Sequence, residues 1–221
     1  MARGASLTEG AQSDTAASDV VVVLDDDPSV RECLENLLAS VGLAAVAFAT
    51  ASECLAYMDR QRPSCLVLDV RLPGKNGLDF HDELKRANIS VPVVFISGYA
   101  DVRMSVRAMK AGAIEFLPKP FREQELLDAI QRGIEQNRER REKGNAIAAL
   151  QARWATLTAR EREVMAGVAR GLRNKSIAIE LGISEVTVKS HRGHVMSKMA
   201  ARTLPDLVRM SDSLAKTTYL Q

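Results

Sequence analysis

Short apolar runs alternate with amphipathic segments from residue 20 to about residue 121. The runs are apolar throughout, which indicates strands buried on both faces and therefore a parallel sheet. The predicted strands are residues 20–24, 44–48, 65–68, 93–96 and 114–117. The predicted helices are residues 29–41, 52–60, 78–87, 102–111 and a helix from 122 onward. Five such strand–helix units predict a doubly wound α/β domain with three layers and the strand order 2-1-3-4-5.

The helix that begins near residue 122 first has an apolar stripe, formed by Leu126, Leu127, Ile130 and Ile134. Residues 135–143 are highly charged and do not continue this stripe. We interpret residues 136–152 as a charged linker that is expected to be helical, with an interruption at Gly144.

The last third of the chain predicts a small helical domain. Thr158 and Glu161 have the spacing of a capping box, in which each side chain satisfies a free amide at the helix start. Three further helices are predicted, capped by Asn174, Ser184 and Thr203 and ending near Gly182, Met199 and Leu214. Two short helices joined by a tight turn containing glycine form a helix-turn-helix.

These patterns divide the chain into four parts. They are a disordered tail at residues 1–18, an α/β domain at 19–135, the linker at 136–152 and an all-α domain of four helices at 153–221. The tail has no apolar segment typical of a signal peptide. The longest apolar stretches have the length of strands and are far too short to span a membrane. We therefore expect a cytoplasmic protein with no membrane segment.

Charge and cysteine content add to this picture. Residues 151–221 carry 12 Lys and Arg against 6 Asp and Glu, whereas residues 1–150 carry 18 against 22. The basic C-terminal part suggests a nucleic-acid surface. Cys33, Cys54 and Cys65 have neither CxxC spacing nor histidine partners, so we expect reduced thiols and not a disulfide framework or a zinc site.

Polar residues follow four of the predicted strands: Asp25 and Asp26, then Asp69, Ser97 and Lys119. Ligands of an open parallel sheet bind outside the carboxyl ends of its strands, so these groups are expected to converge. Acidic groups gathered there repel one another unless a cation joins them, and Mg²⁺ prefers such oxygen ligands. A carboxylate beside Mg²⁺ and a lysine can accept a phosphoryl group, which makes Asp69 the candidate nucleophile.

Residues 20–135 resemble the receiver domain of bacterial response regulators. The matching segments are Leu24-Asp25-Asp26-Asp27, Leu66-Val67-Leu68-Asp69-Val70-Arg71-Leu72-Pro73-Gly74, Ile96-Ser97-Gly98 and Lys119-Pro120-Phe121. The resemblance implies a flavodoxin-like fold and phosphorylation of Asp69 by a sensor histidine kinase. It also implies that Asp26, Asp69 and the backbone carbonyl of Arg71 bind Mg²⁺ or Mn²⁺, with Asp25 close by.

The same resemblance implies a switch. Ser97 is expected to be the switch hydroxyl and Phe116 the switch aromatic, while a cis Lys119–Pro120 bond presents the lysine amine to the phosphate. The family often has Thr and Tyr at the two switch positions, so Phe116 can rotate inward but cannot donate a hydrogen bond. An ordinary core phenylalanine is the alternative interpretation of Phe116. Asp27 is implied to be a third, peripheral acid.

The helix predicted at residues 185–199 has an apolar stripe and a polar face. The polar face consists of Lys189, Ser190, Gly193, His194 and Ser197. Such a face can enter the major groove, which admits one helix. Phosphate contacts are expected from Lys175, Arg192, Lys198 and Arg202. We interpret His191 and His194 as packing or phosphate-contacting groups and not as metal ligands, because no Cys or acid accompanies them in the sequence.

Residues 153–215 resemble the LuxR-type helix-turn-helix, most closely in its FixJ-like branch. The matching segments are Leu157 to Val164, Gly171 to Ala178 and Ile183 to Arg192, the last of which includes Thr187, a further expected DNA contact. The resemblance implies base contacts at Lys189, Ser190 and Gly193. Since Gly193 has no side chain, either Arg192 and His194 compensate or one base is unread. The last helix is implied to form the dimer on DNA.

The prediction is therefore a phosphorylation-dependent transcription regulator and not an enzyme, apart from its own phosphorylation and dephosphorylation. Its expected partners are a sensor histidine kinase, double-stranded promoter DNA, a second copy of the chain and RNA polymerase. One alternative is a phosphohydrolase of haloacid-dehalogenase type, but such enzymes carry the nucleophile on the first strand in a DxD pattern. Another is a receiver that serves only as a phosphate sink, which the intact helix-turn-helix disfavours.

Overall fold

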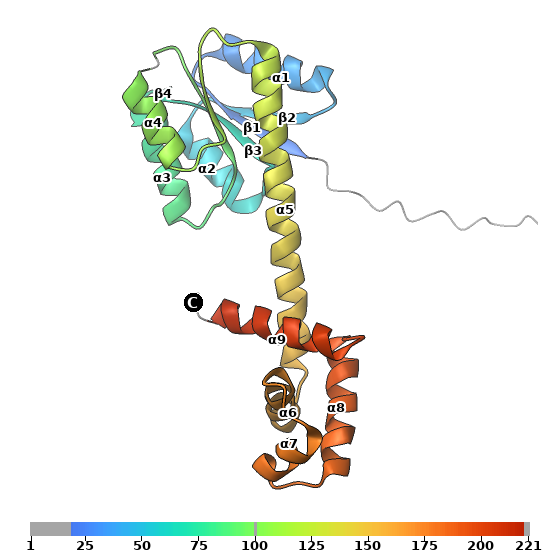
Figure 1. Ribbon diagram of the computed structural model, residues 1–221. Coiled ribbons are helices and arrows are strands. Elements are labelled where there is room, and N and C mark those ends of the chain that lie inside the picture. Colours follow the sequence, from blue (N-terminus) through green and yellow to red (C-terminus); the bar gives the residue numbers. More distant parts are fainter. Residues whose placement is uncertain (1–18, 100, 219–221) are drawn as a thin grey trace, which may run out of the picture. The chain divides into compact units, whose positions relative to one another are not determined.

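The computed structural model describes residues 19–99 and 101–218, so the predicted tail at 1–18 lies outside the described residues. The chain forms two compact units, and the boundary between them along the sequence lies between Glu139 and Arg140, within one helix. The first unit is α/β and the second is helical (Figure 1).

Five parallel strands form the sheet of the first unit. They are β1 (Val20–Leu24), β2 (Ala44–Phe48), β3 (Cys65–Asp69), β6 (Val93–Ser97) and β7 (Glu115–Pro118). Their order is β2-β1-β3-β6-β7, which confirms the predicted order 2-1-3-4-5 once the five strands are numbered among themselves. The register pairs Leu24 with Leu68, Asp69 with Ile96 and Ser97 with Pro118, so these strands end at one edge.

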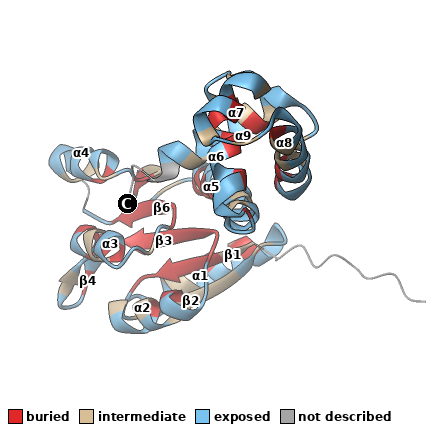
Figure 2. Cartoon of the chain, turned by 90° about the horizontal axis from the view of Figure 1, so that it is seen from below, coloured by how far each residue is buried: buried red, intermediate tan, exposed pale blue. Residues whose placement is uncertain are grey.

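Helices cover both faces of this sheet. Two helices, α1 (Pro28–Ser40) and the first part of α5 (Glu123–Ala155), pack on one face. The other face is covered by α2 (Ala51–Arg60), α3 (Gly77–Arg86) and α4 (Val102–Lys110). Alternate residues of a strand pack on opposite faces of the sheet. Val21 and Val23 pack in the cluster formed with α1 and α5, and Val22 and Leu24 pack in the cluster formed with α2, α3 and α4. Figure 2 shows the resulting buried strands between helices whose outer surfaces are exposed.

A short antiparallel hairpin follows β3 and was not predicted. Its strands are β4 (Arg71–Leu72) and β5 (Lys75–Asn76). Gly74 in its turn has a φ of 74°, a left-handed conformation that glycine adopts without steric cost. Strands of two residues leave too little periodicity for a sequence pattern to reveal.

Helix α5 is continuous over 33 residues, and the predicted interruption at Gly144 was wrong. One interior glycine costs only about 1 kcal/mol relative to alanine, which is too little to break a long hydrogen-bonded helix. Near its end, Leu150 and Trp154 pack against the core of the helical unit. None of the helices in the described part of the chain is long and apolar enough to cross a membrane.

The helical unit contains α6 (Ala159–Ala169), α7 (Asn174–Leu181), α8 (Glu185–Met199) and α9 (Leu204–Thr218) around one apolar core. The capping box of Thr158 and Glu161 is present, and the Ser184 hydroxyl caps α8 by accepting from the Thr187 amide at 3.1 Å. The prediction that Asn174 caps α7 was wrong, because Arg173 holds the cap position without a side-chain bond. The Asn174 side chain instead accepts a hydrogen bond from Arg192 of α8.

Candidate functional site

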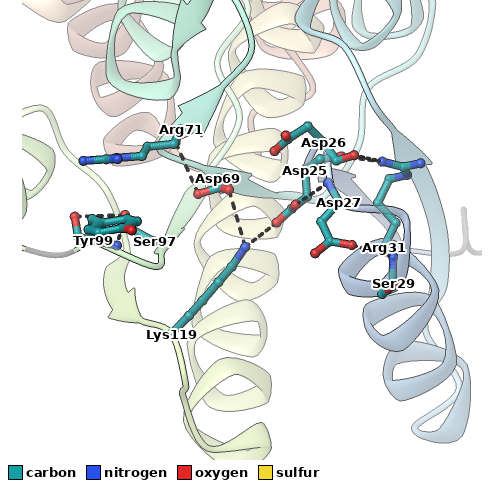
Figure 3. Close-up of polar contacts among 10 residues, drawn as sticks. All are labelled: Asp25, Asp26, Asp27, Ser29, Arg31, Asp69, Arg71, Ser97, Tyr99 and Lys119. Carbon is teal, nitrogen blue, oxygen red and sulfur yellow. Dashed lines mark hydrogen bonds and ion pairs between the residues drawn. The ribbon is translucent and has the colours of Figure 1, made fainter.

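Acidic, hydroxyl and amine groups converge where the central strands end, as the sequence predicted (Figure 3). Asp25 follows β1, Asp69 is the last residue of β3, and Ser97 is the last residue of β6. Lys119 follows β7, and its bond to Pro120 is cis as the resemblance implied. The switch in strand order lies here because β1 and β3 are neighbours in the sheet.

Lys119 links two of the carboxylates. Its Nζ lies 2.6 Å from Oδ2 of Asp25 and 3.4 Å from Oδ2 of Asp69. Asp25 is fully buried and Asp69 is 7% exposed, so both carboxylates need such partners. Figure 3 shows the lysine side chain extending between the two acids.

The acidic loop after β1 is held by local hydrogen bonds. The Arg31 guanidinium donates to the backbone carbonyls of Asp25 and Asp26 at 2.8 and 2.9 Å. The Asp27 carboxylate caps α1 by accepting from the Ser29 amide at 2.8 Å. Asp27 therefore has a structural role, whereas the Asp26 side chain remains exposed at the edge of the site.

Burial and charge shift the pKa values of the two central groups. Burial raises the pKa of Asp69, Lys119 opposes this increase, and the nearby Asp25 adds to it. For Lys119, burial acts to lower the pKa, but the hydrogen bond and charge of Asp25, assisted by Asp69, raise it overall. Lys119 therefore stays charged. It lies beside the Asp69 carboxylate, whose ionised form is destabilised by burial and by the charge of Asp25.

The donor set at this edge suits a hard divalent cation. Asp25, Asp26 and Asp69 each offer an oxygen, and these atoms lie within 4.8 Å of one another. Three carboxylates gather at this edge, and one lysine contacts two of them, which leaves an excess of negative charge for a cation to neutralise. The Arg71 amide donates to Oδ1 of Asp69 at 3.3 Å and so fixes the loop whose carbonyl was an expected ligand.

The expected switch residues lie next to this group. The Ser97 hydroxyl is fully buried, donates to the Tyr99 carbonyl at 3.2 Å and accepts from the Tyr99 amide at 3.3 Å. The Arg71 guanidinium lies 4.0 Å above the Tyr99 ring. Phe116 is 8% exposed and packs against Phe95 with ring centroids 6.5 Å apart, so it occupies a core position here.

Sequence reasoning missed the importance of Gly77. It is the first residue of α3, and its amide donates to the Val70 carbonyl at 2.8 Å. A Cβ at this position would lie 2.2 Å from the Asp69 carbonyl oxygen. Only glycine allows α3 to begin this close to the Asp69 backbone, and no pattern in a single sequence distinguishes such a glycine from a turn glycine.

The helical unit presents the second candidate surface on α8. Val188, Val195 and Met199 are buried in the core, as the apolar stripe predicted. The opposite residues are exposed: Lys189, Ser190, Gly193, His194 and Ser197. Lys175 at the start of α7 and Arg202 beyond α8 are exposed as well.

Three of the expected DNA contacts have partners within the protein. Lys198 forms an ion pair with Glu161 at 2.7 Å, Arg192 is half-buried and bonds to Asn174, and the Thr187 and Ser184 hydroxyls lie 2.8 Å apart. The interpretation that His191 and His194 are not metal ligands rested on the lack of an accompanying acid, but the fold supplies one. Folding brings Glu161 Oε1 to 3.8 Å from Nδ1 of His194, a proximity across 33 positions that sequence spacing cannot reveal.

Comparison with known proteins decides the family. Residues 21–131 match the response regulator receiver domain, and residues 155–211 match the bacterial regulatory proteins of the luxR family. The chain belongs to the response regulators. This response regulator is 52% identical over 206 residues to Nodulation protein W of Bradyrhizobium diazoefficiens, covering 93% of this chain and 91% of that protein.

Other relatives of this response regulator are similar over nearly the full length. The transcriptional regulatory protein FixJ of Rhizobium meliloti is 40% identical, with 86% of this chain and 94% of FixJ covered. The solved structure of the response regulator StyR is 48% identical with a TM-score of 0.80, covering 89% of this chain and 99% of StyR. The chain is thus a response regulator with a LuxR-type DNA-binding domain. This membership leaves the phosphohydrolase and phosphate-sink alternatives without support.

Proposed function

We propose that Asp69 accepts a phosphoryl group from a sensor histidine kinase and that this modification controls binding of α8 to promoter DNA. The observation that carries the proposal is the convergence of Asp25, Asp69 and Lys119 at the switch point of the sheet. Family membership supports a kinase as phosphodonor and DNA as target.

The proposed reaction is an in-line displacement at phosphorus. An Oδ atom of Asp69 forms the new P–O bond as the P–N bond to the kinase histidine breaks, and the imidazole nitrogen keeps the electron pair and takes a proton. Lys119 moves its charge from Asp25 toward the phosphoryl oxygens, where a fixed cation stabilises developing negative charge. The Ser97 hydroxyl donates to one of these oxygens once it leaves the Tyr99 carbonyl.

The oxygen-rich donor set supports Mg²⁺, or Mn²⁺, as the cofactor. Asp26 and Asp69 supply carboxylate oxygens, Arg71 supplies its backbone carbonyl, and Asp25 lies close by. When bound, the ion neutralises charge on the phosphoryl oxygens and joins acids that otherwise repel one another.

Phosphotransfer tests the nucleophile. Asp69→Asn is expected to abolish labelling from a small phosphodonor in the presence of Mg²⁺, because an amide is not a nucleophile. Asp59→Asn, an acid on α2 away from the site, serves as the matched control and keeps full labelling. Unchanged labelling of the Asp69 variant, or label stable in base, would contradict the assignment.

Removal of the exposed carboxylate of Asp26 tests the proposed metal site. Asp26→Ala is expected to weaken Mg²⁺ binding and slow phosphorylation without unfolding the protein, because one carboxylate fewer repels the others in the metal-free state. Calorimetric titration with Mg²⁺ measures the affinity, and equal values for variant and wild type count against this ligand assignment.

We further propose that phosphorylation drives dimerisation through α4 and β7. The support is a set of large apolar side chains left exposed on and before α4: Tyr99, Val102, Val106 and Met109. A patch of this kind on a soluble unit indicates an interaction surface. Beryllofluoride, which mimics the phosphoryl group, is expected to raise the dimer fraction in sedimentation. Val102→Glu is expected to prevent this, and an unchanged association state of the wild type would overturn the mechanism.

Two lysines test the DNA interface. Lys189→Ala is expected to lose about 1–3 kcal/mol for the cognate site and much less for random DNA, because a lysine in the groove can donate to guanine acceptors. Lys175→Ala is expected to weaken both DNAs equally and reduce the salt slope by about one unit, as a phosphate contact does. Equal weakening of both DNAs by Lys189→Ala would show that this residue does not face the bases. Recruitment of RNA polymerase by the bound dimer completes the proposal.

A further inference from the structure

A second group of ligand-type side chains lies in the helical unit, away from the acidic edge of the sheet. Glu161 on α6 and the pair His191 and His194 on α8 each offer one atom, and the three atoms lie within 4.8 Å of one another. The two histidines are three positions apart and therefore share one side of α8. Helices α6 and α8 pack through the common core, which holds the acid opposite the imidazoles.

His191 has an unused ring nitrogen. Its Nδ1 is buried and has no hydrogen-bond partner among the residues that the structure describes. A buried imidazole nitrogen without a partner has lost its hydrogen bond to water and gained none in return, which is unfavourable. A metal ion that accepts an imidazole lone pair would supply the missing interaction.

Glu161 is ready to act as a ligand. Its Oε2 accepts from the Thr158 amide at 2.8 Å and from Lys198 at 2.7 Å, while its Oε1 lies 3.8 Å from Nδ1 of His194. The hydrogen bond from Lys198, followed by that from Thr158, lowers the pKa of Glu161 to about 2. The carboxylate is therefore charged at neutral pH, with one oxygen directed toward the histidines.

We propose that Glu161, His191 and His194 bind Zn²⁺ and that the ion connects α6 to the helix carrying the DNA-facing residues. Two imidazole nitrogens and one carboxylate oxygen, with water in the fourth position, form a set that zinc accepts. Zinc–ligand bonds of 2.0–2.1 Å in a tetrahedron place ligand atoms about 3.3 Å apart. The atoms reach that spacing by small side-chain rotations, and His194, with its side chain 64% exposed, is free to turn.

Lys198 is expected to weaken Zn²⁺ binding at this site, and this effect can be tested by substitution. Its ammonium group contacts the same carboxylate and repels a second cation there. Lys198→Met keeps the apolar stem but removes this charge. The variant is therefore expected to bind Zn²⁺ more tightly than wild type, whereas a lysine variant elsewhere leaves the affinity unchanged.

The test is a Zn²⁺ titration of the full chain in saturating Mg²⁺, which occupies the oxygen site of the receiver unit. We expect one zinc ion to bind, and His194→Ala to weaken binding by about tenfold or more, as loss of a ligand does. Ser197→Ala, an exposed neighbour on α8, is the matched control and retains wild-type affinity. Because His194 is exposed, its variant folds, which circular dichroism verifies.

Co²⁺ substitution provides a second measurement. A nitrogen-containing four-coordinate site gives strong visible absorption bands, whereas six-coordinate Co²⁺ at the carboxylates of the receiver absorbs weakly. These bands are expected in wild type and in Asp69→Asn but not in His194→Ala. No zinc binding by wild type, equal affinity of wild type and His194→Ala, or bands that depend on Asp69 would each overturn the proposal. The experiment involves no phosphorylation, so its outcome does not depend on whether Asp69 accepts a phosphoryl group.

Discussion

At the scale of single residues, the site depends on one position where a side chain does not fit. Gly77 brings the start of α3 against the Asp69 backbone, and a Cβ there would collide with the Asp69 carbonyl oxygen. At Gly144, in the middle of α5, a Cβ would meet no atom within 4 Å among the described residues, apart from its chain neighbours and the helix backbone. The two glycines are therefore expected to respond to the same substitution with opposite signs.

Gly77→Ala is expected to destabilise the receiver unit by about 1–3 kcal/mol, because backbone atoms must shift to admit the methyl group. It is also expected to slow phosphorylation, since the displaced atoms belong to Asp69. The matched variant Gly144→Ala is expected to stabilise the protein by about 0.5–1 kcal/mol. Denaturant unfolding measures both, and a neutral Gly77→Ala would show that the collision is relieved without cost.

His81 makes stability depend on pH. Burial lowers its pKa from 6.5 to about 4, with a smaller contribution from Lys85 that Asp82 opposes. Between these pH values the unfolded chain binds a proton that the folded chain excludes, so the free energy of unfolding decreases as pH falls. The slope approaches about 1.4 kcal/mol per pH unit and disappears above pH 6.5.

The variant His81→Leu isolates this contribution, because all other titrating groups are shared with wild type. The difference in unfolding free energy between the two proteins is expected to be constant above neutral pH. It is expected to shift in favour of the variant as the pH is lowered toward 4. Parallel stability curves over this range would exclude His81 as the source.

At the scale of elements, the helices of the helical unit are capped in different ways at their N-termini. The Thr158 hydroxyl accepts from the Glu161 amide at 3.3 Å, and the Glu161 carboxylate accepts from the Thr158 amide at 2.8 Å. Arg173, at the corresponding position of α7, makes no such bond. The stability of the unit therefore depends unequally on its helix caps.

Thr158→Ala is expected to cost about 1 kcal/mol of unfolding free energy, the usual contribution of a cap side chain. The matched substitution Arg173→Ala is expected to change stability by less than about 0.5 kcal/mol, because no cap bond is lost. Thermal unfolding compares the two, and equal losses would show that the capping box contributes nothing specific.

Elements with strong periodicity were predicted well from the sequence, whereas features made by long-range contacts were not. The strands ending at Asp69 and Ser97 follow from apolar runs, and the buried stripe of α8 follows from Val188 and Val195. The position of Glu161 beside His194 depends on the packing of α6 against α8, which a local pattern does not contain. The Asn174 cap failed for a similar reason, since a tertiary bond to Arg192 takes its side chain.

At the scale of the whole molecule, the two units have separate cores. The sheet packs within two clusters of buried residues and the helical unit within a third, and no described residue is assigned to more than one cluster. Helix α5 contributes Ile130 and Ile134 to one of these clusters, and Leu150 and Trp154 pack against another. Core substitutions are therefore expected to act on one unit at a time.

Val195→Ala is expected to destabilise the helical unit by about 2 kcal/mol through the lost contacts and the cavity left behind. Val67→Ala is the matched change in the sheet, where the valine is equally buried. Hydrogen exchange resolves the units, and each variant is expected to accelerate exchange only in its own unit. Acceleration in both units by either variant would indicate a single cooperative structure.

The unobstructed position of Gly193 bears on how regulators of this kind diverge. Apart from its chain neighbours and the backbone of α8, no atom of the described residues lies within 4 Å of a Cβ built at Gly193, which is exposed beside Lys189 and Ser190 on α8. At the proposed DNA interface, a substitution of Gly193 meets no steric barrier in the fold, so selection on promoter choice can act at this codon. After gene duplication, one copy can acquire a new set of target promoters through this position while its signalling half stays unchanged.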